Sequence, residues 1–443
     1  MNEQYVVLGL ARSRQRWFSE LARWSTSAVA PIEYVKCLTA DEARAVIGSG
    51  RRLSAVVVDA GLPRLDRDLI ALATSAGAAT FVVNDRDVQR DWDALGCSAV
   101  LRSEFGPEEL VEHLTRHARP VDRGSRRTSS AARLGGDRPS EGPLIGVTGA
   151  GGVGSSTVAM ALAQDLATDR AVALVDGARD ADLAMYHDVG DVLPGLPELV
   201  EAHRVDQPEP DQVRELLFDI DERGYRLLLG QRHRRDAAAM RAGSLRAAIE
   251  SLRRCYDTVV VDHDPDVDGE HETGSLDIEE RHALARDLVR RADLIVLVGR
   301  PGVKGLHDMV RLGHRLTDAG LPRARLVPVV AAAPRRPAAR AVTARLLAEL
   351  HPEGTEGSVP PLFVRPVRHL EEVHRSAARL PESLTRPLGR HVRRQLLACG
   401  PRVVEAEEGV RLRHDDLRRR AGALPADRLG VGHHRPDTRS DVA

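Results

Sequence analysis

The chain has 443 residues, of which 42% are hydrophobic and 29% charged, and its formal net charge at pH 7 is −1. This length exceeds one ordinary hydrophobic core, so we expect two folded domains joined by a linker. A net charge near zero gives no whole-chain field that attracts nucleic acid or an anionic membrane, and no specific nucleic-acid partner is expected.

The first part of the chain alternates short β-rich runs with amphipathic stretches. The β-rich runs are YVVLGL, AVVVDAGLP, TFVVND and SAVLRS, and helical patterns occur around residues 14–24 and in PEELVEHLTRH. Strands that alternate with helices predict a parallel α/β sheet. Residues 1–118 are therefore predicted to form one α/β domain.

Residues 119–142 hold glycine, serine, proline and arginine with almost no apolar side chains. Such a composition cannot offset the entropy lost on ordering, so this segment is predicted to be a disordered linker. The tail, residues 401–443, is polar and rich in arginine, and we predict that it is mostly disordered. A basic helix within it, around residues 406–421, is expected to be solvated.

A second alternating series occupies residues 143–400. Its seven β-rich runs are LIGVTG, AVALVDG, YRLLLG, DTVVVDHDP, DLIVLVGRP, RLVPVVAAA and PPLFVRP. Several of them are apolar without alternation, as strands buried on both faces are. This pattern predicts a doubly wound parallel sheet with right-handed crossovers.

The sequence also indicates where the protein resides. It contains no stretch of 18 apolar residues and no signal-type apolar segment near its start, so no transmembrane segment is expected. Its four cysteines are too far apart for a CxxC pair or a metal site, which predicts reduced thiols in the cytoplasm. They are Cys37, Cys97, Cys255 and Cys399.

The strongest motif is GAGGVGSST, which lies between a β-rich run and a helical stretch. Its spacing matches GxxxxGK[ST], except that Ser155 occupies the lysine position. Glycines let successive backbone N–H groups point into one concavity, and the helix that follows adds its positive end. The predicted phosphate-binding residues are Gly149, Gly151, Gly152, Val153, Gly154, Ser155, Ser156 and Thr157.

This glycine-rich segment has two interpretations. It can be a turn that only joins a strand to a helix, but the downstream strand series agrees with a nucleotide-binding core. A lysine at position 155 would neutralise charge on the β- and γ-phosphates, and a serine cannot do so. We therefore expect phosphate affinity to survive in part, without efficient ATP hydrolysis.

The segment AGGVGSST resembles the KGGVGKST loop of the deviant Walker family, which includes ParA, MinD and the CpaE/TadZ pilus-assembly proteins. The resemblance extends over about residues 143–395. AVALVDGARDADLA resembles the second conserved strand, which puts Asp176 near the water and metal. CYDTVVVDHDP resembles the Walker B strand, which puts Asp262 where it would hold Mg²⁺ through water, together with Ser156. The resemblance implies ATP or ADP with Mg²⁺ as the cofactor.

Three departures from the family pattern weaken the case for catalysis. The signature lysine of the family aligns with Ala150, the Walker lysine with Ser155, and the adenine-binding asparagine with Ala331. No arginine within the loop replaces either cation. The candidate catalytic residues that remain are Asp176 and Asp262.

One further charged run, residues 262–272, combines carboxylates with histidines. Its spacing matches no known metal-ligand template, and we interpret it as a solvated switch loop.

The N-terminal domain resembles the receivers of response regulators. VVVDAGLP, with Asp59, is similar to the phosphoacceptor segment, and GCSAVLRSEFGPEEL to the fifth strand and last helix. The first strand lacks the acidic pair that holds Mg²⁺, Arg102 replaces the conserved lysine, and Asn84 replaces the switch Thr/Ser. We interpret it as a degenerate, flavodoxin-like receiver used for dimerisation or docking, and expect no phosphorylation of Asp59.

A degenerate receiver followed by a deviant Walker domain is the arrangement of CpaE/TadZ proteins and of related actinobacterial septum-site-determining proteins. It implies a cytoplasmic homodimer, recruited to the membrane at a pole or septum. Such a protein would position pilus or secretion machinery, including its motor ATPase and inner-membrane components, or act with division proteins in septum placement. Two alternatives stay open: a cycling ParA/MinD-type ATPase that uses an arginine from outside the loop, and the output of a two-component pathway.

Overall fold

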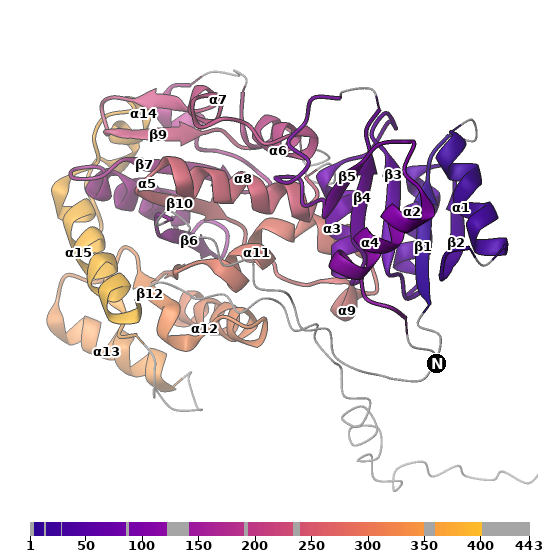
Figure 1. The fold of residues 1–443 in the computed structure, drawn as a ribbon. Helices are drawn as coiled ribbons and strands as arrows, with labels where there is room; N and C mark the ends of the chain where they lie inside the picture. The colour runs from indigo at the N-terminus through magenta and orange to yellow at the C-terminus, as the bar shows by residue number, and fades with distance from the viewer. Residues whose placement is uncertain are drawn as a thin grey trace, which may run out of the picture. The chain divides into compact units, whose positions relative to one another are not determined.

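The structure is a computed structural model, and its two sheets are shown in Figure 1. The predicted tail and most of the predicted linker lie outside the described residues. The residues that the structure describes are 4–12, 15–27, 29–85, 88–121, 141–189, 194–233, 240–349 and 359–400.

The N-terminal sheet has five parallel strands in the order β2-β1-β3-β4-β5. This is the flavodoxin-like order, as predicted for this domain. The strands are β1 (Tyr5–Leu10), β2 (Ile32–Cys37), β3 (Ala55–Asp59), β4 (Ala79–Val83) and β5 (Ala99–Leu101). Strand β2 was not predicted from the sequence, because its side chains are mostly half-buried at the sheet edge and include Glu33 and Lys36.

Helices cover both faces of this sheet. One face packs against aromatic residues of α1 and leucines of α4, and the other against α2 and α3. The helices are α1 (Arg16–Thr26), α2 (Ala40–Gly48), α3 (Arg67–Ser75) and α4 (Pro107–His117). Most of the protein's few aromatic residues lie in this domain; they include Trp17, Phe18 and Phe81, which are fully buried.

The second sheet has eight strands in the order β13-β12-β11-β6-β10-β7-β9-β8. All neighbouring pairs are parallel except β8 with β9, so the predicted doubly wound α/β class is confirmed with one antiparallel edge strand. The strands are β6 (Leu144–Gly149), β7 (Val172–Gly177), β8 (Phe218–Ile220), β9 (Tyr225–Leu228), β10 (Thr258–His263), β11 (Leu294–Gly299), β12 (Leu326–Val330) and β13 (Leu362–Phe363).

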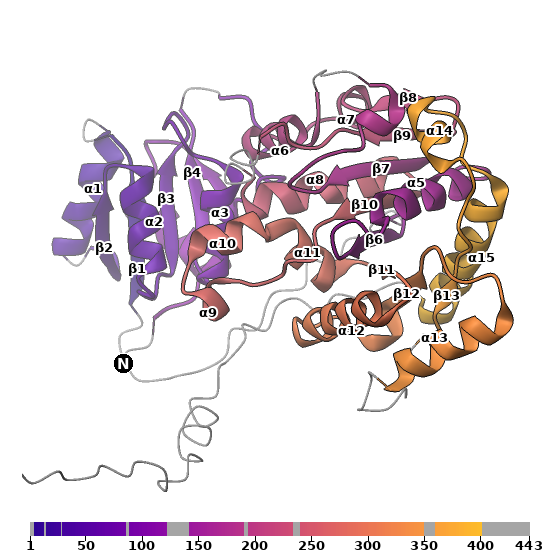
Figure 2. The same cartoon turned by 180° about the vertical axis from the view of Figure 1, so that it is seen from behind.

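Helices also cover both faces of this sheet, as Figure 2 shows from behind. On one face pack α5 (Ser155–Leu166), α14 (Leu370–Arg375) and α15 (Glu382–Cys399). On the other face pack α6 (Leu196–Val205), α7 (Pro210–Glu215), α8 (Ala242–Cys255), α11 (Ala283–Arg291), α12 (Val303–Asp318) and α13 (Pro337–Glu349). The short helices η1 (Met185–His187), α9 (Glu270–Thr273), α10 (Leu276–Arg281) and η3 (Arg323–Arg325) lie in connections.

Burial of the central strands holds the glycine-rich segment in place. Every residue of β6, β10 and β11 is buried, which agrees with their apolar runs. Residues 158–166 of α5 are buried as well, because this helix lies between the sheet and α15. A Cβ added at Gly389 of α15 would meet the Asp165 carboxylate at 1.7 Å, so α15 approaches α5 closely.

No helix in the described ranges is both long and apolar enough to cross a membrane.

Candidate functional site

The glycine-rich segment forms a tight loop between β6 and α5. Gly152 and Gly154 have φ angles of 76° and 96°, a left-handed conformation that glycine adopts without strain. Between them, the Val153 N–H donates to the Ala150 carbonyl over 3.3 Å. Gly154 immediately precedes α5, whose first N–H groups have no partner within the helix. The loop therefore has the backbone shape of an anion-binding nest at a helix N-terminus.

The predicted phosphate-binding residues differ in what they contact. Six of the eight, residues 152–157, line a cavity, while Gly149 and Gly151 do not. A Cβ at Gly149 would lie 2.6 Å from the Val298 carbonyl oxygen, so this glycine allows β6 and β11 to pack closely. Gly151 is exposed and has no heavy atom near its Cβ position, so it serves the turn alone.

The cavity has a volume of about 370 Å³, which lies within the usual range for small-ligand sites. Apart from the loop and α5, it is walled by residues that follow β7, β11, β12 and β13, and by η1, α14 and α15. Its lining there is Asp182, Tyr186, Arg300, Ala331, Ala332, Val364, Arg365, Pro366, Val367, Leu370, Glu371, His374 and Leu384. Ala331, which aligns with the adenine-binding asparagine of the family, is thus part of this wall.

Asp176 and Asp262 lie side by side at the ends of β7 and β10, where they are register partners. Their side chains are only 1% and 4% exposed. The Ser156 hydroxyl donates a hydrogen bond to the Asp262 carboxylate. Asp176 accepts a hydrogen bond from the Leu183 N–H at 2.8 Å through Oδ2, and its Oδ1 has no hydrogen-bond partner among the described residues.

Burial without a cation perturbs both carboxyl groups. Desolvation, together with the charge of the neighbouring Asp262, raises the pKa of Asp176 to about 8. Desolvation also raises the pKa of Asp262 to about 7. These carboxylates and the Ser156 hydroxyl are the hard oxygen ligands that Mg²⁺ prefers, and a cation beside them would offset the cost of burying them. The residues present therefore fit a Mg²⁺ site.

Several residues of the site were not predicted from the sequence, because they come from segments far from the loop along the chain. Nε2 of His374 lies 3.3 Å from Oγ1 of Thr157, and the His374 ring lies 4.6 Å from the Tyr186 ring. Burial, aided by the charge of Arg223, lowers the pKa of His374, so this ring is neutral at pH 7. No local sequence pattern joins residue 374 to the loop.

Arg223 is a buried, positively charged residue that contacts α5. It is 1% exposed, and its guanidinium contacts the Met160 sulfur at 3.0 Å, His187 Nε2 at 3.2 Å and the Ala378 carbonyl at 3.1 Å. No carboxylate among the described residues pairs with it. A buried cation that has only neutral partners favours an anion nearby.

The receiver-like domain has a small cavity of about 80 Å³ at Asp59, the residue that ends β3. The Asp59 carboxylate already accepts two hydrogen bonds, from Gln15 Nε2 at 2.5 Å and from the Gly61 N–H at 2.8 Å. Asn84 bonds to the backbone of Val88, and Arg102 is exposed. The polar side chains that line this cavity beside Asp59 are Gln15 and a single acidic residue, Asp85.

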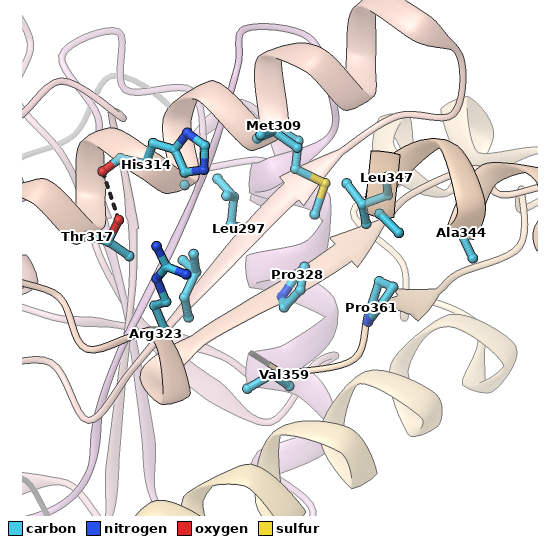
Figure 3. Close-up of a pocket in the computed structure, with 14 residues that line it drawn as sticks. Leu297, Met309, His314, Thr317, Arg323, Pro328, Ala344, Leu347, Val359 and Pro361 are labelled. Carbon is cyan, nitrogen blue, oxygen red and sulfur yellow. Dashed lines mark hydrogen bonds between the residues drawn. The ribbon is translucent and has the colours of Figure 1, made fainter. Parts of the chain in front are cut away.

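A third cavity, shown in Figure 3, lies between α12, α13 and the strands β11 and β12. It has a volume of about 160 Å³, and its lining is mainly aliphatic, with Met309, Leu347 and Pro328 among the side chains. The glycine-rich loop contributes nothing to it, and no carboxylate lines it. This cavity is therefore separate from the loop site.

No protein-family model matches the chain, and no curated protein has a significantly similar sequence. Solved structures do show similarity. A ParA family ATPase from Chlorobium tepidum TLS is 16% identical, covering 57% of this chain and 98% of its own, at a TM-score of 0.43. The cell division ATPase MinD from Pyrococcus furiosus is 17% identical, covering 57% and 99%, at a TM-score of 0.42.

The septum site-determining protein MinD from Pyrococcus horikoshii OT3, in complex with Mg-ADP, is 18% identical, covering 58% of this chain and 97% of its own, at a TM-score of 0.40. The similarity to these three ATPases covers 57–58% of this chain. Since all three TM-scores are below 0.5, the strand order and the loop of this chain, and not the similarities, identify its fold.

The raised pKa values predict how stability depends on pH. Asp176 has a folded pKa near 8 and an unfolded value of about 4, so its contribution to stability is full below pH 4 and is lost as the pH rises through about 8. Asp176→Asn removes this titration. In metal-free buffer, the wild-type midpoint of thermal unfolding should therefore fall between pH 5 and pH 9 by a few degrees more than that of the variant.

Asp318→Asn, which changes an exposed carboxylate at the end of α12, is the control and should follow the wild-type profile. Equal pH profiles for Asp176→Asn and the wild type would contradict the prediction.

Proposed function

We propose that this protein is a nucleotide-binding localisation or assembly factor of the ParA/MinD type, with little or no ATPase activity. The observation that carries the proposal is the loop between β6 and α5. It has the left-handed glycines and helix N-terminus of a phosphate-binding loop, but holds Ser155 where a lysine is expected. Binding and hydrolysis thus make different demands on this loop.

Binding depends on groups that the loop retains. Residues 152–157 line the cavity, and apart from the Val153 N–H, which is bonded within the loop, their N–H groups would offer donors to the phosphate oxygens. The α5 dipole favours negative charge there. Ser156 and Asp262, with Asp176 beside them, would hold Mg²⁺, which supplies positive charge to the phosphates. Binding of the metal would displace protons from carboxyl groups whose pKa values lie near 7 and 8.

Hydrolysis depends on groups that the loop lacks. In phosphoryl transfer, cations stabilise the negative charge that spreads over the equatorial oxygens of the transition state. Loss of one such preorganised group typically costs a factor of about 10² to 10³ in rate. Neither Ala150 nor Ser155 supplies a charge, so turnover should be slow even where nucleotide binds.

The proposed cellular role follows from the order of the domains. We divide the chain into a receiver-like domain (1–118), a linker (119–142), a ParA/MinD-like domain (143–400) and a tail (401–443). In this proposal the chain is a cytoplasmic homodimer that is recruited to the membrane at a pole or septum. It would position pilus or secretion machinery, with its motor ATPase, or act with division proteins in septum placement. The receiver-like domain would serve dimerisation or docking rather than phosphorylation, since the Asp59 carboxylate is already hydrogen-bonded.

Binding of fluorescent ATP and ADP, with and without Mg²⁺, tests the nucleotide site. We expect saturable binding that Mg²⁺ strengthens. Gly154→Arg should abolish it, because arginine at a φ of 96° is strained and its side chain fills the concavity. Gly151→Ala, at an exposed loop position without near neighbours, is the matched control and should retain binding. Unchanged affinity in Gly154→Arg would mean that the nucleotide binds elsewhere.

Turnover separates the proposed factor from a cycling ATPase. We expect a wild-type kcat below about 1 per minute, far under the usual range for enzymes. Ser155→Lys should raise both ATP affinity and turnover, since it restores the charge at the β- and γ-phosphates, whereas Ser155→Ala should change neither appreciably. A faster wild-type rate that Asp262→Ala abolishes would support the cycling alternative instead.

A further inference from the structure

Two arginines line the cavity from outside the loop. Arg300 and Arg365 are both exposed at its wall. Among the described residues, neither guanidinium has a hydrogen-bond or ion-pair partner. Arginine side chains at the mouth of a cavity, with no protein carboxylate bound to them, are available to an anionic ligand.

Strand register puts Arg300 next to the loop. Strand β11 is the neighbour of β6, and Val298 is the register partner of Gly149. Arg300 lies two residues beyond this pair, directly after β11, and it lines the same cavity as residues 152–157 of the loop. Neighbouring strands are about 4.8 Å apart, so a guanidinium at this strand end can reach an anion held by the loop.

Arg365 lies farther from the loop. It follows Val364, which is fixed to the β12 end by hydrogen bonds with Val330 at 3.0 Å and Ala333 at 2.7 Å. Strand β13 is three strands from β6 in the sheet order, or about 14 Å at the usual spacing. Arg365 therefore lines the cavity at a strand end farther from the loop, together with the apolar Pro366 and Val367.

The acidic side chains of the cavity come from another part of its wall. Asp182 precedes η1, and Glu371 belongs to α14, which contacts η1. The strand ends thus contribute the cations and the η1–α14 flank contributes the anions. Small side chains at Ala331 and Ala332 separate the two arginines and leave the space between them open.

We propose that Arg300 binds the terminal phosphates of ATP from within the same chain. This contact holds the ligand, but one guanidinium does not restore the two loop lysines, so slow turnover is still expected. The inference rests on the proposed nucleotide binding. A guanidinium can donate two parallel N–H bonds to phosphate oxygens. Because Arg300 would meet the terminal phosphates, this contact favours a nucleoside triphosphate over a monophosphate. Arg365 lies along the sugar and base end of the nucleotide, where a guanidinium plane stacks on a purine. The two arginines thus bind different parts of the nucleotide.

Calorimetric titration of the full-length chain with ATP and with AMP, in Mg²⁺ at fixed salt, tests this assignment. Arg300→Ala should weaken ATP binding about ten- to a hundredfold, the usual effect of losing charge-assisted hydrogen bonds. Its AMP affinity should stay within about threefold of the wild type, because AMP does not reach Arg300. Arg300→Lys keeps the charge but loses the two parallel N–H donors of the guanidinium. Its ATP affinity should therefore lie between those of the wild type and Arg300→Ala.

Arg365→Ala is the matched variant, since it removes an exposed arginine from the same cavity. It should weaken ATP and AMP binding by equal factors. Thermal unfolding of each variant shows whether it folds, and both positions are exposed, so midpoints near that of the wild type are expected.

The outcomes also separate this inference from the nucleotide proposal. If the wild type binds ATP and Gly154→Arg does not, but Arg300→Ala binds ATP as tightly as the wild type, the role of Arg300 is wrong and the nucleotide site stands. Equal losses of ATP and AMP binding in Arg300→Ala would also overturn it, since they indicate a general effect on the cavity. If the wild type binds neither nucleotide, both proposals fail.

Discussion

The site depends on the direction of a few backbone N–H groups at the start of α5. Gly152 and Gly154, in left-handed conformations, turn the chain into a tight loop, and residues 152–157 line one cavity. A buried sheet and a buried helix hold the loop on both sides, so little reorganisation is needed when an anion arrives. Because these donors belong to the main chain, they are retained in this loop although it lacks the charged lysine side chains of the family pattern.

Negative charge in the site itself is the second constraint. Asp176 and Asp262 meet at adjacent strand ends, and their raised pKa values express the cost of burying two carboxyl groups without a cation. A divalent cation would remove that cost and would also neutralise phosphate oxygens. Metal and nucleotide binding are therefore expected to reinforce each other, and the cavity to respond to nucleotide state even without fast hydrolysis. This behaviour suits a switch or a scaffold.

Local patterns in the sequence predicted much of the fold. The loop, the long apolar strands and the two acidic strand ends each have a signature within about ten residues, and the structure has these elements. Two edge strands were not predicted: β2 carries mixed polar side chains, and β8 is three residues long and antiparallel. The fold class did not depend on them, since the central strands alone predict a doubly wound sheet.

The site was predicted less completely, because the order of the strands in the sheet brings distant residues to the part of the cavity outside the loop. Arg300, Arg365 and His374 reach the cavity only because β11, β12 and β13 follow β6 across the sheet. A search for replacement cations within the loop, residues 149–157, therefore found none. Arg223 was missed for a similar reason, since its contact with Met160 of α5 spans 63 residues.

The most direct test is a crystal structure of the full-length protein with Mg²⁺ and a non-hydrolysable ATP analogue. The account predicts phosphate oxygens within hydrogen-bond distance of the N–H groups of Gly152 and residues 154–157, with no lysine ammonium group at the terminal phosphate. The chain's only lysines are Lys36 and Lys304. A loop that stays empty at saturating ligand, or a lysine of a second copy bound to that phosphate, would contradict the account.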